Sequence, residues 1–303
     1  INDRRKRPPP PEGRLYNPEL TRTANQEFFE EAKRLKMKFI FAWGTGPDLA
    51  WHQIMDERLE KMGFTRDDYI FKGGIRDEFK KSDIPANQAF RDAILAANPG
   101  WKFQAVYLST PPPSGATLED LEAARLTDFY KNWTIISGRL ADPQRGPETI
   151  AYFRERGCDI WPYRCNRNMQ TLPVLEYYRF FPWFAYLNDL DGVAFWTAYS
   201  SKGDDGFDHR DGYDDGIAWR GIKKTPIPTK RLHAVREGLE DVAYMHLLKQ
   251  ALEQARGRLG QDELAKYEKL LKETPAQLMQ DNSQAAVNTW RRQTGEAIDA
   301  LQP

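Results

Sequence analysis

Short apolar runs alternate along this chain with longer segments of mixed polarity. The apolar runs predict buried parallel strands, because a strand that is covered on both faces carries near-continuous apolar residues. We expect such strands at residues 38–44, 68–75, 101–109, 129–137, 158–164 and 192–200. The mixed segments have apolar residues at helical spacing. They predict helices at residues 18–37, 47–63, 84–100, 117–127, 146–157 and 172–190.

The alternation of six strands with helices predicts a parallel sheet. Such a sheet is either open and doubly wound or closed into a barrel. No strand is followed by GxGxxG or GxxxxGK[ST], so the nucleotide-binding form of the open sheet has no support. We therefore predict an α/β fold, a (β/α)8 TIM-like barrel. Six strands are two too few, and we expect the missing ones before Ile1 or one of them within residues 216–222.

Three regions follow from the same pattern. Residues 1–18 are basic and then proline-rich, which predicts an extended arm without a core of its own. Residues 19–227 carry the strand and helix alternation and form the predicted barrel. Residues 228–303 are helical throughout, with one long helix followed by two more charged helices. Within the barrel region, Gly63 is expected to end the helix that begins at residue 47. We expect the helices of 228–303 to pack on the outside of the barrel as a C-terminal extension.

Charge and composition narrow the classes of partner. The chain has 303 residues, with 44 basic and 44 acidic side chains, so no net field draws it to nucleic acid or to an anionic membrane. No apolar run approaches the roughly 20 residues that span a bilayer. Aromatic residues make up 13% of the chain and include nine Trp. This content is typical of sugar-binding clefts, although core packing also uses aromatic residues.

Cysteine and histidine give no sign of a metal site. Cys158 and Cys165 are expected to be free, buried thiols. The four His form no ligand spacing, so no metal and no cofactor are predicted. Residues 200–216 hold six Asp with Gly between them, but the spacing of a calcium loop is absent, and a solvated loop is the better interpretation.

The carboxyl ends of barrel strands are where active sites lie. Asp77 and Glu78 follow the strand predicted at 68–75, and they are the candidate catalytic pair. Aromatic and basic residues at other strand ends or on the following helix are candidates for substrate binding: Trp43, Tyr107, Trp133, Trp161, Tyr163, Arg179 and Trp196. Tyr163 is two residues beyond Trp161 and is therefore expected on the same face of its strand.

Two acids among aromatic residues, without a metal or cofactor motif, indicate glycoside hydrolysis. One carboxyl protonates the leaving oxygen, and its neighbour handles the positive charge that develops on the sugar. Adjacent residues of a strand point to opposite faces, so Asp77 and Glu78 suit the usual retaining pair poorly. They better fit substrate-assisted cleavage, in which the 2-acetamido oxygen of the sugar attacks the anomeric carbon.

Less specific interpretations stand beside these. Asp77 and Glu78 also fit a solvated turn, since Lys80, Lys81 and Asp83 follow. Tyr178, Arg179 and Trp183 share the spacing of a packed helix face. In the segment REGLEDVAYMHLL, the spacings of Arg236 with Glu240 and of Glu237 with Asp241 indicate an ion-paired, packed helix.

Three segments resemble the catalytic region of glycoside hydrolase family 123 and its uncharacterised bacterial relatives. They read CDIWPYRC, LEYYRFFPWFAYLNDLDGVAFWTAY and PIPTKRLHAVREGLEDVAYMHLL. The resemblance covers roughly residues 35 to 250. It implies a (β/α)8 barrel that acts as a β-N-acetylgalactosaminidase outside the cytoplasm, with Asp77 orienting the acetamido group and Glu78 as general acid and base. Phe79 stands where the family usually has Pro, a difference that bears on the sugar accepted.

Two other functions fit the same residues. The chain fits a non-catalytic, carbohydrate-binding or structural barrel protein. It also fits a glycosidase of another specificity, in which Glu78 works with a distant carboxylate such as Asp128 or Asp191.

Overall fold

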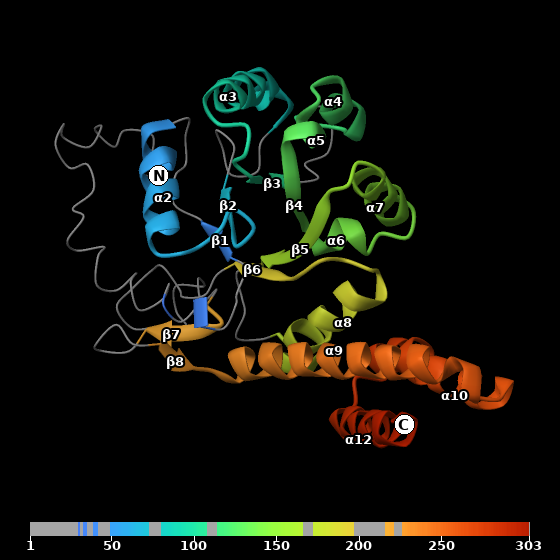
Figure 1. The fold of residues 1–303 in the computed structure, drawn as a ribbon. Helices are drawn as coiled ribbons and strands as arrows, with labels where there is room; N and C mark the ends of the chain where they lie inside the picture. Colours follow the sequence, from blue (N-terminus) through green and yellow to red (C-terminus); the bar gives the residue numbers. More distant parts are fainter. Residues whose placement is uncertain are drawn as a thin grey trace. The chain divides into compact units, whose positions relative to one another are not determined.

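The protein is described by a computed structural model (Figure 1). It describes residues 30, 33–34, 39–41, 49–72, 80–107, 114–165, 172–196, 216–220 and 226–302. Two compact units can be distinguished, one made of residues 1–77 with 83–105 and the other of residues 78–82 with 106–303. The helices after residue 228 therefore belong to the same unit as the strands that follow residue 106.

The first unit contains two strands, the helices that follow them and the start of a third strand. These elements are β1 (Phe39–Phe41), α2 (Leu49–Lys61), β2 (Tyr69–Lys72), α3 (Ile84–Ala97) and the first part of β3 (Phe103–Tyr107). The strands are parallel, with Phe41 opposite Phe71 and Phe71 opposite Phe103. Gly63 ends α2 as expected: its φ of 80° is left-handed, and the Phe64 amide donates to the Leu59 carbonyl.

A buried carboxylate ties α2 to the strands of the first unit. Asp56 accepts hydrogen bonds from the Tyr69 hydroxyl, from Arg66 and from the Trp101 indole, the last at 2.8 Å. Burial, followed by the bond to Asp56, raises the pKa of Tyr69. Apolar residues surround this cluster, so α2 is fixed on the sheet by packing as well as by hydrogen bonds.

The second unit continues the strand and helix alternation. Its strands are β4 (Tyr130–Ile136), β5 (Asp159–Cys165) and β6 (Ala194–Trp196), which are parallel neighbours in this order. Over the whole sheet the strand order is β1-β2-β3-β4-β5-β6, the order of the chain. Helices fill the connections: α4 (Leu118–Ala123), α5 (Leu126–Phe129), α6 (Ser137–Leu140), α7 (Arg145–Glu155), the π-helical turn η3 (Leu175–Arg179) and α8 (Phe180–Leu187).

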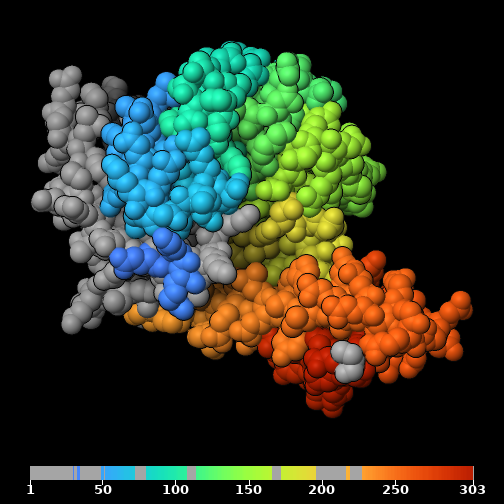
Figure 2. All heavy atoms as spheres, in the orientation of Figure 1, coloured from blue at the N-terminus to red at the C-terminus, as the bar shows by residue number. Residues whose placement is uncertain are grey.

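A helical layer with a core of its own forms the end of the chain. It consists of α9 (Lys230–Ala255), η4 (Arg256–Arg258), α10 (Gln261–Leu271), α11 (Glu273–Asp281) and α12 (Gln284–Leu301). In the space-filling view, the surface of α12 adjoins that of α9 (Figure 2). Phe180 and Trp183 of α8 belong to the same apolar cluster as Met245 and Trp290, so these helices and α8 share one core.

The structure corrects three sequence-based expectations. Residues 216–222 do not supply a missing strand of the parallel sheet, because β7 (Ala218–Arg220) pairs antiparallel with β8 (Pro226–Pro228) in a separate sheet. Two helices were expected after α9, and three are present. Cys158 and Cys165 are both free, but Cys165 is exposed at the end of β5.

The predicted order of strands and helices is confirmed over the described residues. The fold is mixed α/β, with a parallel sheet in chain order and C-terminal helices, and it is compatible with an incomplete α/β barrel. The described residues do not form a full eight-stranded barrel. Within them, none of the helices combines the length and apolar content needed to cross a bilayer.

Candidate functional site

The two faces of the sheet in the second unit differ in what they contact. Trp133 of β4 packs on Phe153 of α7, with ring centroids 4.9 Å apart. Tyr107, at the end of β3, contacts both of these rings. Trp133 and Tyr107 therefore mark the face of the sheet that is covered by α7.

The opposite face carries polar and aromatic side chains. Side chains alternate between the faces of a strand, so Asn132 and Thr134 point away from α7. In the parallel register Thr134 lies opposite Trp161 and Ile136 opposite Tyr163, so these aromatic residues share that face. We call the four residues Asn132, Thr134, Trp161 and Tyr163 the polar face. The expected placement of Trp161 and Tyr163 on one face is confirmed by this register.

The side chains of the polar face are mostly buried. Asn132, Thr134 and Tyr163 are buried, and Trp161 is half-buried. The Trp161 indole is held against Gly192: a Cβ added at Gly192 would lie 3.0 Å from its Cε2 atom. Any larger residue at position 192 would place its Cβ too close to the indole. Trp161 therefore lies directly on the backbone that leads into β6.

Asn132 has no hydrogen-bond partner for its side chain among the described residues. It is 1% exposed, and both its Oδ1 and its Nδ2 are buried and unpaired. Leaving a buried amide unpaired costs about 1–3 kcal/mol, and buried polar groups in folded proteins are almost always paired. An unpaired amide is therefore a feature that requires an explanation.

Two of the sequence candidates lie on the other face and are engaged there. The Tyr107 hydroxyl donates to the Ala116 carbonyl at 3.0 Å, and burial raises the pKa of Tyr107. The Trp133 indole is fully buried and donates to the Tyr130 carbonyl at 2.7 Å. Both residues act in the packing between the sheet and α7, and the structure does not bring them together with Trp161 and Tyr163.

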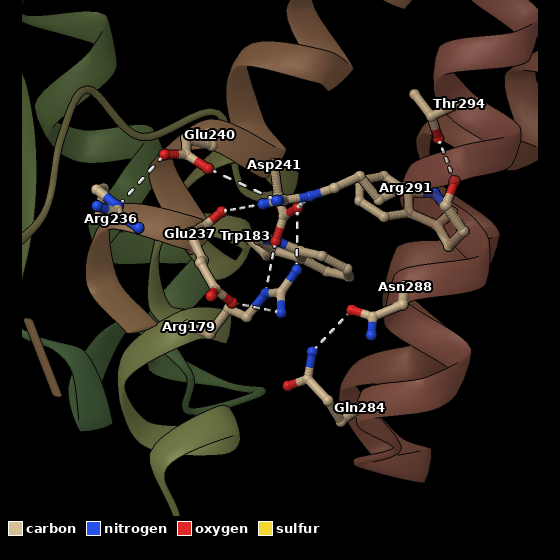
Figure 3. Close-up of polar contacts among 11 residues, drawn as sticks. Arg179, Trp183, Arg236, Glu237, Glu240, Asp241, Gln284, Asn288, Arg291 and Thr294 are labelled. Carbon is tan, nitrogen blue, oxygen red and sulfur yellow. Dashed lines mark hydrogen bonds and ion pairs between the residues drawn. The ribbon is translucent and has the colours of Figure 1, made fainter. Parts of the chain in front are cut away.

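Arg179 is held in a buried ion cluster between helices. Its Nε donates to Oδ2 of Asp241 at 2.8 Å, and its Nη1 donates to Oε2 of Glu237 at 2.7 Å. Arg291 of α12 donates from Nε to Oδ1 of Asp241 at 2.6 Å, and the Trp183 indole donates to Oδ2 at 3.2 Å. Figure 3 shows that these side chains converge from η3, α8, α9 and α12.

The ion cluster identifies the role of the segment REGLEDV. Arg179 is 2% exposed and Asp241 is 0% exposed, so the pair is sealed from solvent. Glu237 and Asp241 pair with arginines of other helices, while Arg236 pairs with Glu240 within α9 at 3.4 Å. The expected packed, ion-paired helix is confirmed, with Glu237 and Asp241 acting between helices instead of within one.

Arg164, which follows Tyr163 in β5, points to the helical side of the sheet. Its guanidinium lies over the rings of Tyr177 and Phe181, 4.7 and 4.4 Å from their centroids. It donates to the backbone carbonyls of Glu176 and Tyr177. Burial lowers the pKa of Arg164. Arg164 thus supports the carbonyl groups of the π-helical turn.

The two alternative carboxylates lie at the amino ends of strands. Asp128 is in α5, directly before β4, and forms an exposed ion pair with Arg125 at 2.8 Å. Asp191 precedes β6, pairs with Arg154 at 2.9 Å and accepts from the Ile160 amide at 2.7 Å. Active sites of barrels lie at the carboxyl ends, so these positions are typical of structural acids.

Several predicted site residues fall outside the description. Trp43, Asp77, Glu78 and the loop 200–215 are outside the described residues, and so is the arm at 1–18. Trp196 is the last residue of β6, and its side chain is not described.

A separate groove of about 980 Å³ lies in the helical part of the second unit. Tyr186 of α8 and His246 of α9 form one of its walls, with ring centroids 5.0 Å apart. Asp191, one of the two alternative carboxylates, lines it, whereas Tyr107, Trp133, Trp161, Tyr163 and Arg179 do not. Among the described residues no group of His, Cys, Asp and Glu is arranged to hold a metal ion.

Sequence reasoning missed Asn132 and Thr134. The signal was available, because β4 reads YKNWTII and the alternation of a strand sets Asn132 and Thr134 opposite to Trp133. The prediction was directed at the aromatic residue Trp133 and overlooked the polar residues on either side of it.

Neither a family model nor a curated protein sequence matches this chain.

Proposed function

We propose that the protein is a retaining glycosidase that cleaves β-linked N-acetylhexosaminides, with N-acetylgalactosaminides favoured, by substrate assistance. The observation that carries the proposal is the pair of Trp161 and Tyr163 on one face of β5, beside Thr134 of β4. A pyranose ring stacks on a flat indole face, and hydroxyl groups beside it supply hydrogen bonds. The family resemblance of the sequence supports the same function.

Asp77 and Glu78 supply the chemistry in this proposal. The acetamido oxygen of the substrate attacks the anomeric carbon while Glu78 gives its proton to the departing glycosidic oxygen. Asp77 accepts a hydrogen bond from the acetamido N–H and orients the group for attack. Water then adds to the anomeric carbon of the cyclic intermediate and gives a proton to Glu78, so the configuration is retained and the acid is regenerated.

The proposed binding residues include the two aromatic side chains of the polar face. Trp161 carries the sugar ring, and Tyr163 donates its hydroxyl to the acetamido carbonyl. In this proposal Trp43 and Trp196, whose side chains are outside the described residues, add to the aromatic lining. We leave Tyr107, Trp133 and Arg179 out of this set, because their polar groups are engaged in packing on α7 or in the ion cluster. A complete (β/α)8 barrel around this lining also belongs to the proposal, since parallel strands in chain order are typical of it.

The acetamido requirement tests the mechanism. The protein is expected to release p-nitrophenol from the N-acetyl-β-D-galactosaminide and not from the β-D-galactoside, which lacks the internal nucleophile. Asp77→Asn should lower kcat by about 10²–10⁴-fold with the circular dichroism spectrum unchanged. Equal turnover of the two substrates would contradict substrate assistance and leave a different glycosidase mechanism.

A non-catalytic carbohydrate-binding protein is the second candidate. One observation favours it: Asn132, Thr134, Trp161 and Tyr163 of the polar face are all uncharged, so catalysis depends wholly on Asp77 and Glu78. The two candidates differ in one measurement. A binding protein gives saturable N-acetylgalactosamine binding without hydrolysis of any chromogenic hexosaminide.

A further inference from the structure

Arg164 joins the end of β5 to the π-helical turn η3, the next element along the described chain. Its Nη1 donates to the Glu176 carbonyl at 3.2 Å and also to the Tyr177 carbonyl. Its guanidinium lies over the rings of Tyr177 and Phe181. Arg164 is the next-to-last residue of β5, so these contacts are made at the carboxyl end of the strand. Active sites of barrel folds lie at that end.

The π-helical turn requires a donor from outside the helix. In η3 the Phe180 amide donates to the Leu175 carbonyl, a spacing of five residues. At the same spacing the partner of the Tyr177 carbonyl is residue 182, and Pro182 has no N–H to donate. A carbonyl that is removed from water without a donor lowers stability. Arg164 donates to the Tyr177 carbonyl and so completes the hydrogen bonding of η3.

The same end of the sheet is held by aromatic packing on the helical side. Phe195 of β6 lies opposite Arg164 in the parallel register. Tyr178 of η3 stacks on Phe195 with ring centroids 5.7 Å apart, and Phe181 packs against its edge at 5.2 Å. Tyr163 precedes Arg164 in β5 and points to the other face of the sheet. The contacts of Arg164 on the helical side therefore fix the strand end that carries Tyr163.

We propose that Arg164 is a positioning residue of the proposed sugar site, which it supports from the far face of the sheet. It holds the end of β5 in the place from which Tyr163 donates to the acetamido carbonyl, and it does not touch the substrate. The inference rests on the proposed function and adds a residue to it. Lysine carries the same charge but has no planar group that stacks on two rings while it donates.

Arg154 of α7 provides a matched control. It too is an arginine that donates to a backbone carbonyl beside a strand, that of Asp189, and it pairs with Asp191 at 2.9 Å. These contacts precede β6 and are therefore at the amino end of the sheet, away from the proposed site. Removal of either arginine is expected to lower the melting temperature. Only removal of Arg164 is expected to change substrate binding.

The test compares Arg164→Met, Arg164→Lys and Arg154→Met with the wild type in the hydrolysis of p-nitrophenyl N-acetyl-β-D-galactosaminide. Unfolding of part of a sample lowers the apparent kcat and leaves KM unchanged, because the molecules that stay folded bind normally. Displacement of a binding residue raises KM instead. We expect KM to rise at least about tenfold in Arg164→Met, with kcat within about threefold of the wild type. Arg164→Lys should show a smaller rise in KM, and Arg154→Met should keep the KM of the wild type.

The outcomes separate this inference from the proposed function. Wild-type KM in Arg164→Met and Arg164→Lys would overturn the inference and leave the proposed function standing. An equal rise in KM in Arg154→Met would do the same, because the effect would then come from general loosening of the fold. If Arg164→Met does not fold, Arg164→Lys carries the comparison, since it keeps the charge and a donor. Absence of turnover by the wild type would refute the proposed function and the inference with it.

Discussion

Asp241 is a fully buried carboxylate that two arginines share. Arg179 and Arg291 both donate to it, and the Trp183 indole adds a further hydrogen bond. A buried ion pair gives little net stability relative to an apolar replacement, but removal of one partner leaves a charge stranded. At this position the stranded charge would be Arg179, whose side chain is enclosed between helices.

Replacement of this carboxylate is therefore expected to destabilise the protein strongly. Asp241→Ala should lower the free energy of unfolding by about 3–5 kcal/mol, measured by urea denaturation. Glu296→Ala is the control, because its pair with Arg292 is exposed and such pairs contribute only about 0.3–0.5 kcal/mol. Similar losses in the two variants would argue against a sealed cluster around Asp241.

The sequence shows which residue types alternate along β4 and β5, but it does not show which contacts their side chains make. Trp161 and Tyr163 could be assigned to one face because the period of a strand is two. The unpaired state of Asn132 and the engagement of Tyr107 and Trp133 with α7 depend on which neighbours the fold brings near. Such contacts join residues across the sheet and leave no local pattern.

At the scale of elements, α9 is fixed on the π-helical turn by a glycine. A Cβ added at Gly238 would overlap the carbonyl oxygen of Arg179 and lie 3.1 Å from Cγ of Pro182. The close approach brings Glu237 and Asp241 within reach of Arg179. The distance between α9 and η3 is therefore set by the absence of a side chain at Gly238 and by the ion cluster that this close approach permits.

Two glycine substitutions separate packing from helix propensity. Gly238→Ala should lower the free energy of unfolding by about 1–3 kcal/mol, because the backbone of η3 must move away from α9. Gly295→Ala, inside α12, should raise it by about 0.5–1 kcal/mol, since a Cβ there has only ordinary contact with Tyr244. Thermal unfolding of both variants measures the difference. A stabilising Gly238→Ala would contradict the close approach.

The sequence pattern identified the strands of the parallel sheet and the long helices, but it missed β8 and the π-helical turn. Strands β4 and β5 and helices α3 and α9 have enough residues for a clear pattern. β8 has three residues and begins and ends with Pro, which removes ladder donors and hides the strand from sequence reasoning. The π-helical turn before α8 differs from an α-helix only in its hydrogen bonds, so the same apolar spacing predicted both as one helix.

At the scale of the whole chain, the fold and the proposed function rest on different observations. The parallel sheet in chain order was predicted from the alternation of strands and helices, and the described residues bear it out. All six strands of this sheet were predicted, but residues 216–222, which have the composition of a strand, pair with β8 instead of joining it. The proposed function rests on Asp77 and Glu78, on the polar face and on the resemblance, so it requires a direct chemical test.

That test is the hydrolysis of p-nitrophenyl N-acetyl-β-D-galactosaminide by the wild type and by Glu78→Gln. The amide keeps the shape of the side chain and cannot donate or accept the catalytic proton. We predict measurable turnover by the wild type and a loss of at least about 10²-fold in Glu78→Gln, with an unchanged melting temperature and unchanged binding of N-acetyl-D-galactosamine. Equal turnover by the two proteins would contradict the account.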